Sequence, residues 1–326
     1  AFAKKANFKS VMWGAEHNLA IAYLNMGQHD SSLFYAMLAD GMAQTLQSPV
    51  LIYNSKNILG SVYLEKFDFT QAKKSFDEAM KLIQTTPSIP HKSRVYLNLA
   101  NYHYKLLQFS KGITILKEGE AFAKKEDDIS DLMDIYGNLG QMYAFTGKID
   151  SSQIYLLAAL DYFHKTGKLR KEAVINQKLG LAYGSFNNNA KMEQYLSKAY
   201  QQFNSIGDDR TAINTLMIKV NSYFKSYQLS KCLQILNTIE PEAIKINHKP
   251  AIALSYLYKG AIFSLIGDTA NAAKFQKIAE ALSNEVNIPT FTKMNMMLKA
   301  VVLSMKSKTR EGDSLSRIVL AAAQKE

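Results

Sequence analysis

The sequence predicts an all-α protein built as a right-handed superhelical solenoid of stacked antiparallel helix hairpins. The first observation is a unit of 40 residues in which a small residue is followed three positions later by an aromatic one. The second is a turn residue seven positions after the small one, with apolar residues at helical spacing on both sides. A repeat of roughly 20 to 50 residues that contains two helices indicates a helical repeat array.

About eight repeats follow one another without an insertion or a deletion. Their central positions are Ala20, Gly60, Ala100, Gly140, Gly180, Val220, Gly260 and Ala300. The last repeat departs most from the common pattern, because Leu303 stands at the position that is usually aromatic. Since an array grows by adding units to one core, we expect residues 1–326 to form a single repeat array without an internal domain boundary.

The first helix of each repeat carries a leucine directly before the small residue, as at Leu59, Leu139 and Leu179. The leucine and the small residue lie four and three positions before the aromatic one, so all three share one helix face. Glycine or alanine lets the two helices of a hairpin approach closely. Glycine lowers helix propensity by about 1 kcal/mol relative to alanine. Close packing of the two helices must therefore stabilise the protein by more than that amount.

A short turn ends the first helix at Gly27, Gly147, Asn187 and Gly267, residue types that tolerate the left-handed conformation. Three residues later stand polar side chains that could accept hydrogen bonds from the free N–H groups of the second helix. These expected caps are Asp30, Thr70, Ser110, Asp150 and Ser230.

Both ends of the sequence look interrupted. Residues 1–5 are identical to residues 121–125, three periods later, so we interpret residues 1–8 as the end of a truncated preceding repeat. At the other end, a final helix has an apolar face and no successor. Its apolar residues are Leu315, Ile318, Val319 and Ala322. We therefore expect more chain at both ends, with a possible missing output domain beyond residue 326.

Composition excludes some classes of function. The formal net charge is +11, but the basic residues are dispersed and lack the interleaved aromatic residues that stack nucleic-acid bases. We therefore expect no specific nucleic-acid binding through this region. No apolar run is long enough to span a membrane, and a single cysteine excludes an internal disulfide framework. We expect a soluble region, periplasmic or cytoplasmic.

The order of Leu139, Gly140, Tyr143, Gly147 and Asp150 resembles the tetratricopeptide repeat, and the match covers nearly the whole chain. The spacing of 40 residues exceeds the usual 34 or so. It looks like the long-period variant of kinesin-light-chain-like proteins and of bacterial regulator sensor arrays. The resemblance implies a non-catalytic protein- or peptide-binding scaffold, the sensor or interaction region of a larger bacterial regulator such as a transcriptional regulator or histidine kinase. The alternatives are a structural scaffold that binds folded proteins and a peptide-responsive, phosphatase-like regulator.

No residue pattern indicates an enzyme, a cofactor or a metal site. None of the six histidines has metal-ligand spacing with another His, Cys or carboxylate on one helix face. His103 stands at an aromatic packing position and Cys232 at a small packing position. The acidic run 126–131 opens a helix, where negative charge is favourable, and it lacks the alternating oxygen ligands of a calcium loop.

The most informative set faces away from the buried stripe of the first helices, at two residues before, one after and five after the small position. The predicted peptide-binding residues are Asn18, Asn98, Asn101, Lys105, Asn138, Gln141, Phe145, Lys178 and Leu181. In the peptide-binding proteins that the repeats resemble, asparagine two before the small residue holds the peptide backbone. The alternative is that asparagine is merely tolerated on an exposed helix face. We expect the two lysines to favour an acidic partner.

A second candidate surface lies toward the C-terminus, where the equivalent positions become apolar. It could be an apolar pocket or the contact surface of a missing segment. Its residues are Leu257, Leu265, Met294, Met297, Leu298 and Met305.

Overall fold

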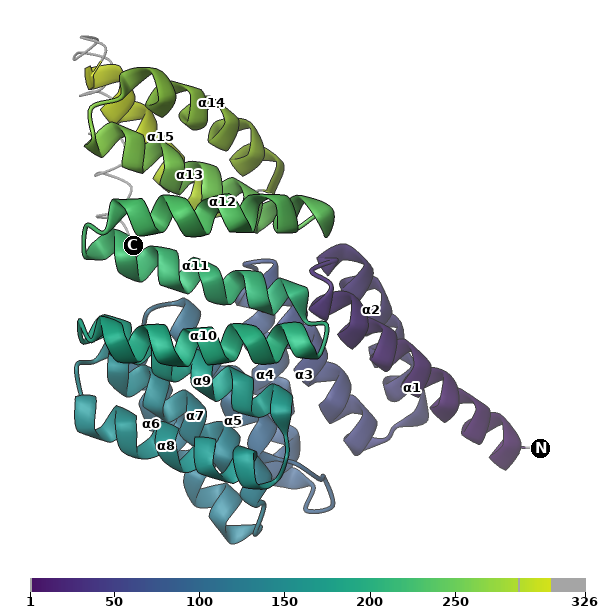
Figure 1. The fold of residues 1–326 in the computed structure, drawn as a ribbon. Coiled ribbons are helices and arrows are strands. Elements are labelled where there is room, and N and C mark those ends of the chain that lie inside the picture. Colours follow the sequence, from purple (N-terminus) through teal and green to yellow (C-terminus); the bar gives the residue numbers. More distant parts are fainter. Residues whose placement is uncertain (1, 287, 306–326) are drawn as a thin grey trace. The chain divides into compact units, whose positions relative to one another are not determined.

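The computed structural model describes residues 2–286 and 288–305, and these contain fifteen α-helices and no strand (Figure 1). The all-α fold class is therefore confirmed. By its internal contacts the chain divides into two compact units, residues 1–166 and 167–326, and each unit is described by itself.

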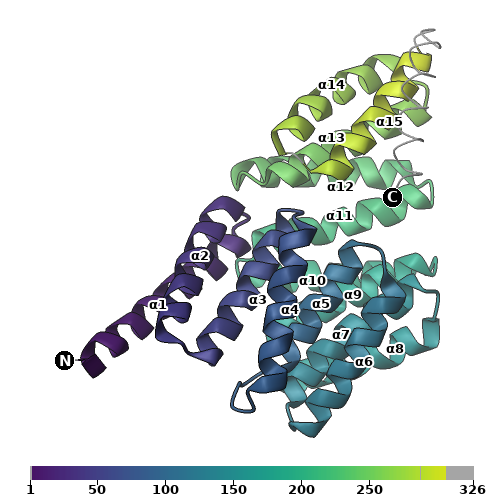
Figure 2. The same cartoon turned by 180° about the vertical axis from the view of Figure 1, so that it is seen from behind.

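Unit one contains four helix hairpins that are stacked in chain order (Figure 2). In each hairpin the first helix packs against the second, and in the first three hairpins it also contacts the first helix of the next hairpin. The helices are α1 (Phe2–Asn25), α2 (His29–Leu46), α3 (Pro49–Glu65), α4 (Phe69–Thr85), α5 (Ser93–Lys105), α6 (Phe109–Lys125), α7 (Ile129–Phe145) and α8 (Ile149–Lys165).

Unit two repeats this arrangement with three hairpins and one further helix among its described residues. That last helix, α15, packs against both helices of the preceding hairpin. The helices are α9 (Leu169–Ser185), α10 (Asn189–Ser205), α11 (Asp209–Lys225), α12 (Leu229–Lys245), α13 (Lys249–Leu265), α14 (Thr269–Val286) and α15 (Pro289–Met305).

The small positions lie where the two helices of a hairpin meet. A Cβ added to Gly60 would lie 2.3 Å from the Phe76 ring, and one added to Gly180 would lie 2.4 Å from Leu196 Cγ. The sequence interpretation of these glycines is therefore confirmed. The preceding leucine is buried in most repeats, but Leu19 is 39% exposed, because no earlier helix packs on α1 within the part of the chain that the structure describes.

In the last three repeats, all in unit two, this buried leucine is replaced by a lysine, at Lys219, Lys259 and Lys299. Each ammonium group pairs with a glutamate of the preceding second helix: Lys219 with Glu193 at 2.6 Å, Lys259 with Glu240, and Lys299 with Glu280 at 2.7 Å. Helix stacking in unit two therefore includes half-buried ion pairs at a position that is apolar in unit one.

The turns are shorter than the sequence suggested. Gly27 and Gly147 adopt positive φ as expected, and the residue that follows is already the N-cap of the second helix. The predicted caps three residues after the glycine were therefore wrong by two positions, since Asp30 and Asp150 lie inside the first turn. The side chain that caps α4 is Asp68, which accepts a hydrogen bond from Gln71 N at 3.0 Å.

Residues 2–8, expected to end the second helix of a preceding repeat, instead continue without a break into α1. This stretch contains no glycine or proline to stop a helix. The apolar residues Leu315, Ile318, Val319 and Ala322 lie outside the described residues. Among the helices that are described, none combines the length and apolar character required to cross a bilayer.

Candidate functional site

Four of the predicted site residues form what we call the amide face: Asn98 and Asn101 on α5, and Asn138 and Gln141 on α7. Asn101 is exposed, and the other three are half-buried. The helices α5 and α7 are in contact, so the structure brings these amides together on neighbouring first helices of unit one.

The Asn98 amide is oriented by the preceding repeat. Its Nδ2 donates to Asn57 Oδ1 at 2.8 Å, and Asn57, buried on α3, donates in turn to Tyr53 O at 3.0 Å. Asn138 Nδ2 donates to Asp134 O at 2.9 Å, within its own helix. The Asn98 bond thus crosses to the preceding repeat, whereas this bond of Asn138 stays within α7.

Lys105 is paired with an acidic residue. Its Nζ lies 2.9 Å from Glu65 Oε2, and it also lies 5.2 Å from the centre of the Phe67 ring. Glu65 and Lys105 occupy equivalent positions one repeat apart. Because the glutamate largely neutralises this ammonium group, Lys105 contributes little positive charge with which to attract an acidic ligand.

Beside the amide face lie three aromatic side chains, Tyr104, Phe109 and Phe145, which we call the aromatic wall. Phe145 is 37% exposed. Its ring stacks on Phe109, with centroids 5.0 Å apart and planes within 9°, and it contacts Tyr104 at 5.6 Å. Burial raises the pKa of Tyr104, and a hydrogen bond with Gln141 partly offsets that rise. Sequence reasoning found only Phe145, because Tyr104 and Phe109 stand outside the three positions that it considered.

The remaining predicted residues lie apart from this group. Asn18 is exposed on α1, but the equivalent position of the next repeat is Ile58, which is buried. Lys178 and Leu181 are half-buried on α9 and belong to unit two. Within unit one, the structure therefore gathers Asn98, Asn101, Lys105, Asn138, Gln141 and Phe145.

The apolar surface predicted near the C-terminus was partly wrong. Leu257 and Leu298 are only 3% and 6% exposed and belong to the hydrophobic core of unit two. They face inward because they pack against Ala272 and Ala279 of α14. Leu265 and Met297 are exposed, at 53% and 57%.

Two residues with reactive side chains are packing residues. Cys232 is fully buried, and burial raises its pKa to about 11, so its thiolate is scarcely populated near neutral pH. His103 is half-buried, and its Nδ1 lies 2.9 Å from Gln108 Oε1. Desolvation lowers the pKa of His103 despite that contact, which favours the neutral form.

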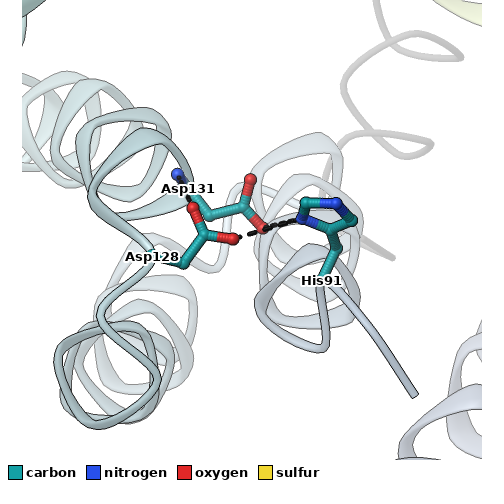
Figure 3. A group of neighbouring side chains, drawn as sticks. All are labelled: His91, Asp128 and Asp131. Atoms are coloured by element: carbon teal, nitrogen blue, oxygen red, sulfur yellow. Dashed lines mark hydrogen bonds and ion pairs between the residues drawn. The ribbon is translucent and has the colours of Figure 1, made fainter. Parts of the chain in front are cut away.

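The structure also brings together three residues that sequence reasoning missed, namely His91, Asp128 and Asp131 (Figure 3). The histidine precedes α5, and the two aspartates lie at the start of α7. A search along one helix could not find this group. His91 and Asp131 are 40 residues apart, so a search at the repeat period would have paired them.

Comparisons with known proteins agree with this architecture. A family model described as tetratricopeptide repeat matches residues 53–86 and 134–163, which lie in the second and fourth hairpins. A search of curated protein sequences finds no match.

Several solved structures are similar in fold at low sequence identity. One is a Rap protein complexed with competence and sporulation factor, at 10% identity and a TM-score of 0.66, covering 98% of each chain. Another is NprR in complex with its cognate peptide NprX, at 16% identity and a TM-score of 0.55, covering 93% of this chain and 78% of that one.

A third similar structure is a signal transduction ATPase from Pyrococcus horikoshii with a tetratricopeptide repeat sensor. It has 17% identity and a TM-score of 0.59, and the match covers 89% of this chain and 45% of that longer one. With the matched repeats and the stacked hairpins, these likenesses show that the chain has a tetratricopeptide-like repeat fold.

Proposed function

We propose that unit one binds an extended peptide, or an unstructured protein segment, across the amide face and against the aromatic wall. The observation that carries this proposal is the row of amides on α5 and α7 beside an exposed aromatic ring, Phe145. In this proposal the protein is a non-catalytic interaction scaffold, the sensor or interaction region of a larger bacterial regulator.

An amide group suits a peptide backbone because it both donates and accepts hydrogen bonds. The bond from Asn98 to Asn57 uses one amide hydrogen of Asn98, and its carbonyl oxygen takes no part in that bond. Repeated amides can therefore hold the backbone whatever the side chains of the peptide are. The aromatic wall offers a contact for one apolar side chain, which would supply specificity.

The charge pattern refines the expected ligand. The sequence suggested an acidic peptide, but Glu65 pairs with Lys105 beside the amide face. A peptide with little net charge and an apolar or aromatic side chain fits this surface better. The similar Rap protein is in complex with competence and sporulation factor, and the similar NprR is in complex with its cognate peptide NprX, which supports the proposal at the level of the fold.

The test is calorimetric titration with peptides selected from a random library on the immobilised protein. Asn101→Ala with Gln141→Ala removes two amides and leaves the Asn98–Asn57 bond in place. At about 0.5 to 1.5 kcal/mol for each hydrogen bond, affinity should fall roughly fivefold to 150-fold. The matched control is Gln44→Ala with Gln84→Ala, exposed amides on the second helices α2 and α4, and it should bind as wild type does.

Unchanged affinity in the amide-face variant would contradict the proposal. It would favour the alternative scaffold that binds folded proteins on its outer surface. One observation points to that alternative, since the second helix α2 exposes Phe34 and Met37 at 58% and 57%.

A further inference from the structure

We propose that His91, Asp128 and Asp131 form a binding site for a divalent transition-metal ion, with zinc as the expected ion. His91 Nδ1 lies 3.2 Å from Asp128 Oδ2 and 3.9 Å from Asp131 Oδ2. One ligand atom from each residue lies within 4.8 Å of the other two. Ligands bound to one ion at about 2.1 Å are roughly 3 to 4.2 Å apart, so only small shifts are needed to close around an ion.

The three side chains come from two separate segments, and Figure 3 shows these side chains pointing toward one another. Asp128 is the N-cap of α7, and its Oδ1 accepts from Asp131 N at 3.0 Å. That bond fixes the carboxylate while Oδ2 faces the histidine. Asp131 Oδ2 accepts from Ser93 Oγ at 2.5 Å, the kind of outer contact that orients a metal-binding carboxylate.

The loop that carries His91 is held in place before any ion binds. Ile89 is buried in the core of unit one, at 3% exposure. The carbonyl of His91 accepts hydrogen bonds from the Tyr53 hydroxyl at 2.9 Å and from Arg94 N at 3.1 Å. Pro87 and Pro90 further restrict the loop. A site whose ligands are already positioned loses less free energy on binding.

The chemistry of the ligands selects the class of ion. Imidazole nitrogen with carboxylate oxygen suits zinc and similar first-row ions, whereas calcium and magnesium prefer oxygen ligands alone. Two carboxylates also balance the charge of a divalent ion. The positive end of α7 opposes a cation, which should weaken binding of the ion. Bound zinc would connect the start of the third hairpin to the start of the fourth.

The experiment is calorimetric titration of zinc, magnesium and calcium into the full chain. His91→Asn removes the imidazole, and asparagine tolerates the positive φ of 49° at this position. Asp128→Asn removes one charge and keeps a good helix N-cap. Each variant should bind zinc at least about tenfold more weakly. When cobalt replaces zinc as a spectroscopic probe, the visible spectrum of the bound cobalt should also change in each variant. The control is His164→Asn, an exposed histidine on α8, which should bind as wild type does.

Two results would overturn the proposal. One is the absence of zinc binding by wild type at submillimolar concentration. The other is wild-type zinc affinity in both His91→Asn and Asp128→Asn, which would place the bound ion at other residues. Tighter binding of calcium or magnesium than of zinc would overturn the choice of ion.

Discussion

Leu156 of α8 fills the space that a side chain at Gly140 of α7 would need. A Cβ on residue 140 would lie 2.5 Å from Leu156 Cγ and 3.0 Å from the backbone oxygen of Ser152. Gly140→Ala should therefore destabilise the protein by about 1 to 3 kcal/mol in urea unfolding, because the two helices must separate. This cost should exceed the gain in helix propensity from replacing glycine.

Gly41→Ala is the matched control. Gly41 is exposed in α2, and nothing lies within 4 Å of an added Cβ. This change should stabilise the protein by about 0.5 to 1 kcal/mol through helix propensity alone. If both substitutions had the same sign, close helix packing would not be the reason for glycine at position 140.

His248 should make unit two less stable as pH falls. It is 4% exposed, and its Nε2 lies 3.0 Å from Asn214 Oδ1. Burial, assisted by the charge of Arg210, lowers the pKa of His248 to about 4. An unfolded chain binds the proton near pH 6.5, so stability is complete above that pH and is lost as pH falls toward 4.

This effect of His248 should amount to about 2 kcal/mol between pH 7 and pH 5. The measurement is urea unfolding at both pH values for wild type and for His248→Gln, whose amide can still donate to Asn214. The variant should lose about 2 kcal/mol less than wild type. Equal losses would show that His248 does not couple stability to pH.

The pair of Lys259 and Glu240 should respond differently to the loss of each partner. Lys259 is 6% exposed. Burial alone would raise the pKa of Glu240, but hydrogen bonds from Lys259 and Tyr256 lower it overall. Glu240→Gln leaves a buried ammonium without its counter-charge and should cost roughly 1 to 3 kcal/mol.

Lys259→Leu restores the residue type found at this position in repeats one to five. Since apolar replacement of a buried charge is often close to neutral, this variant should stay within about 1 kcal/mol of wild type in urea unfolding. A larger loss for Lys259→Leu than for Glu240→Gln would show that the ion pair is a net source of stability.

Glu65 should control the charge preference of the amide face. Glu65→Gln releases Lys105 from its ion pair and keeps a hydrogen-bond acceptor. Calorimetry with a selected peptide and an acidic version of it should show an improvement for the acidic one of up to about fivefold at low salt. The gain should vanish at high salt. Its persistence at high salt would exclude an effect of the Lys105 charge.

The sequence by itself determined the all-α fold class, the 40-residue repeat and the packing role of its glycines. It could do so because these features depend on spacing within one chain segment. The turns at Gly27 and Gly147 were found for the same reason. The sequence placed the N-caps of the second helices wrongly, because one left-handed residue shortens the turn and moves the N-cap two residues earlier.

Only the tertiary structure decided which side chains meet across repeats. The partners of Asn98 and Lys105 are Asn57 and Glu65, each about one repeat away. A helical wheel places a residue on a face but does not say what the next helix presents to it. The meeting of His91 with Asp131 has the same origin, since stacking repeats brings equivalent positions 40 residues apart into contact.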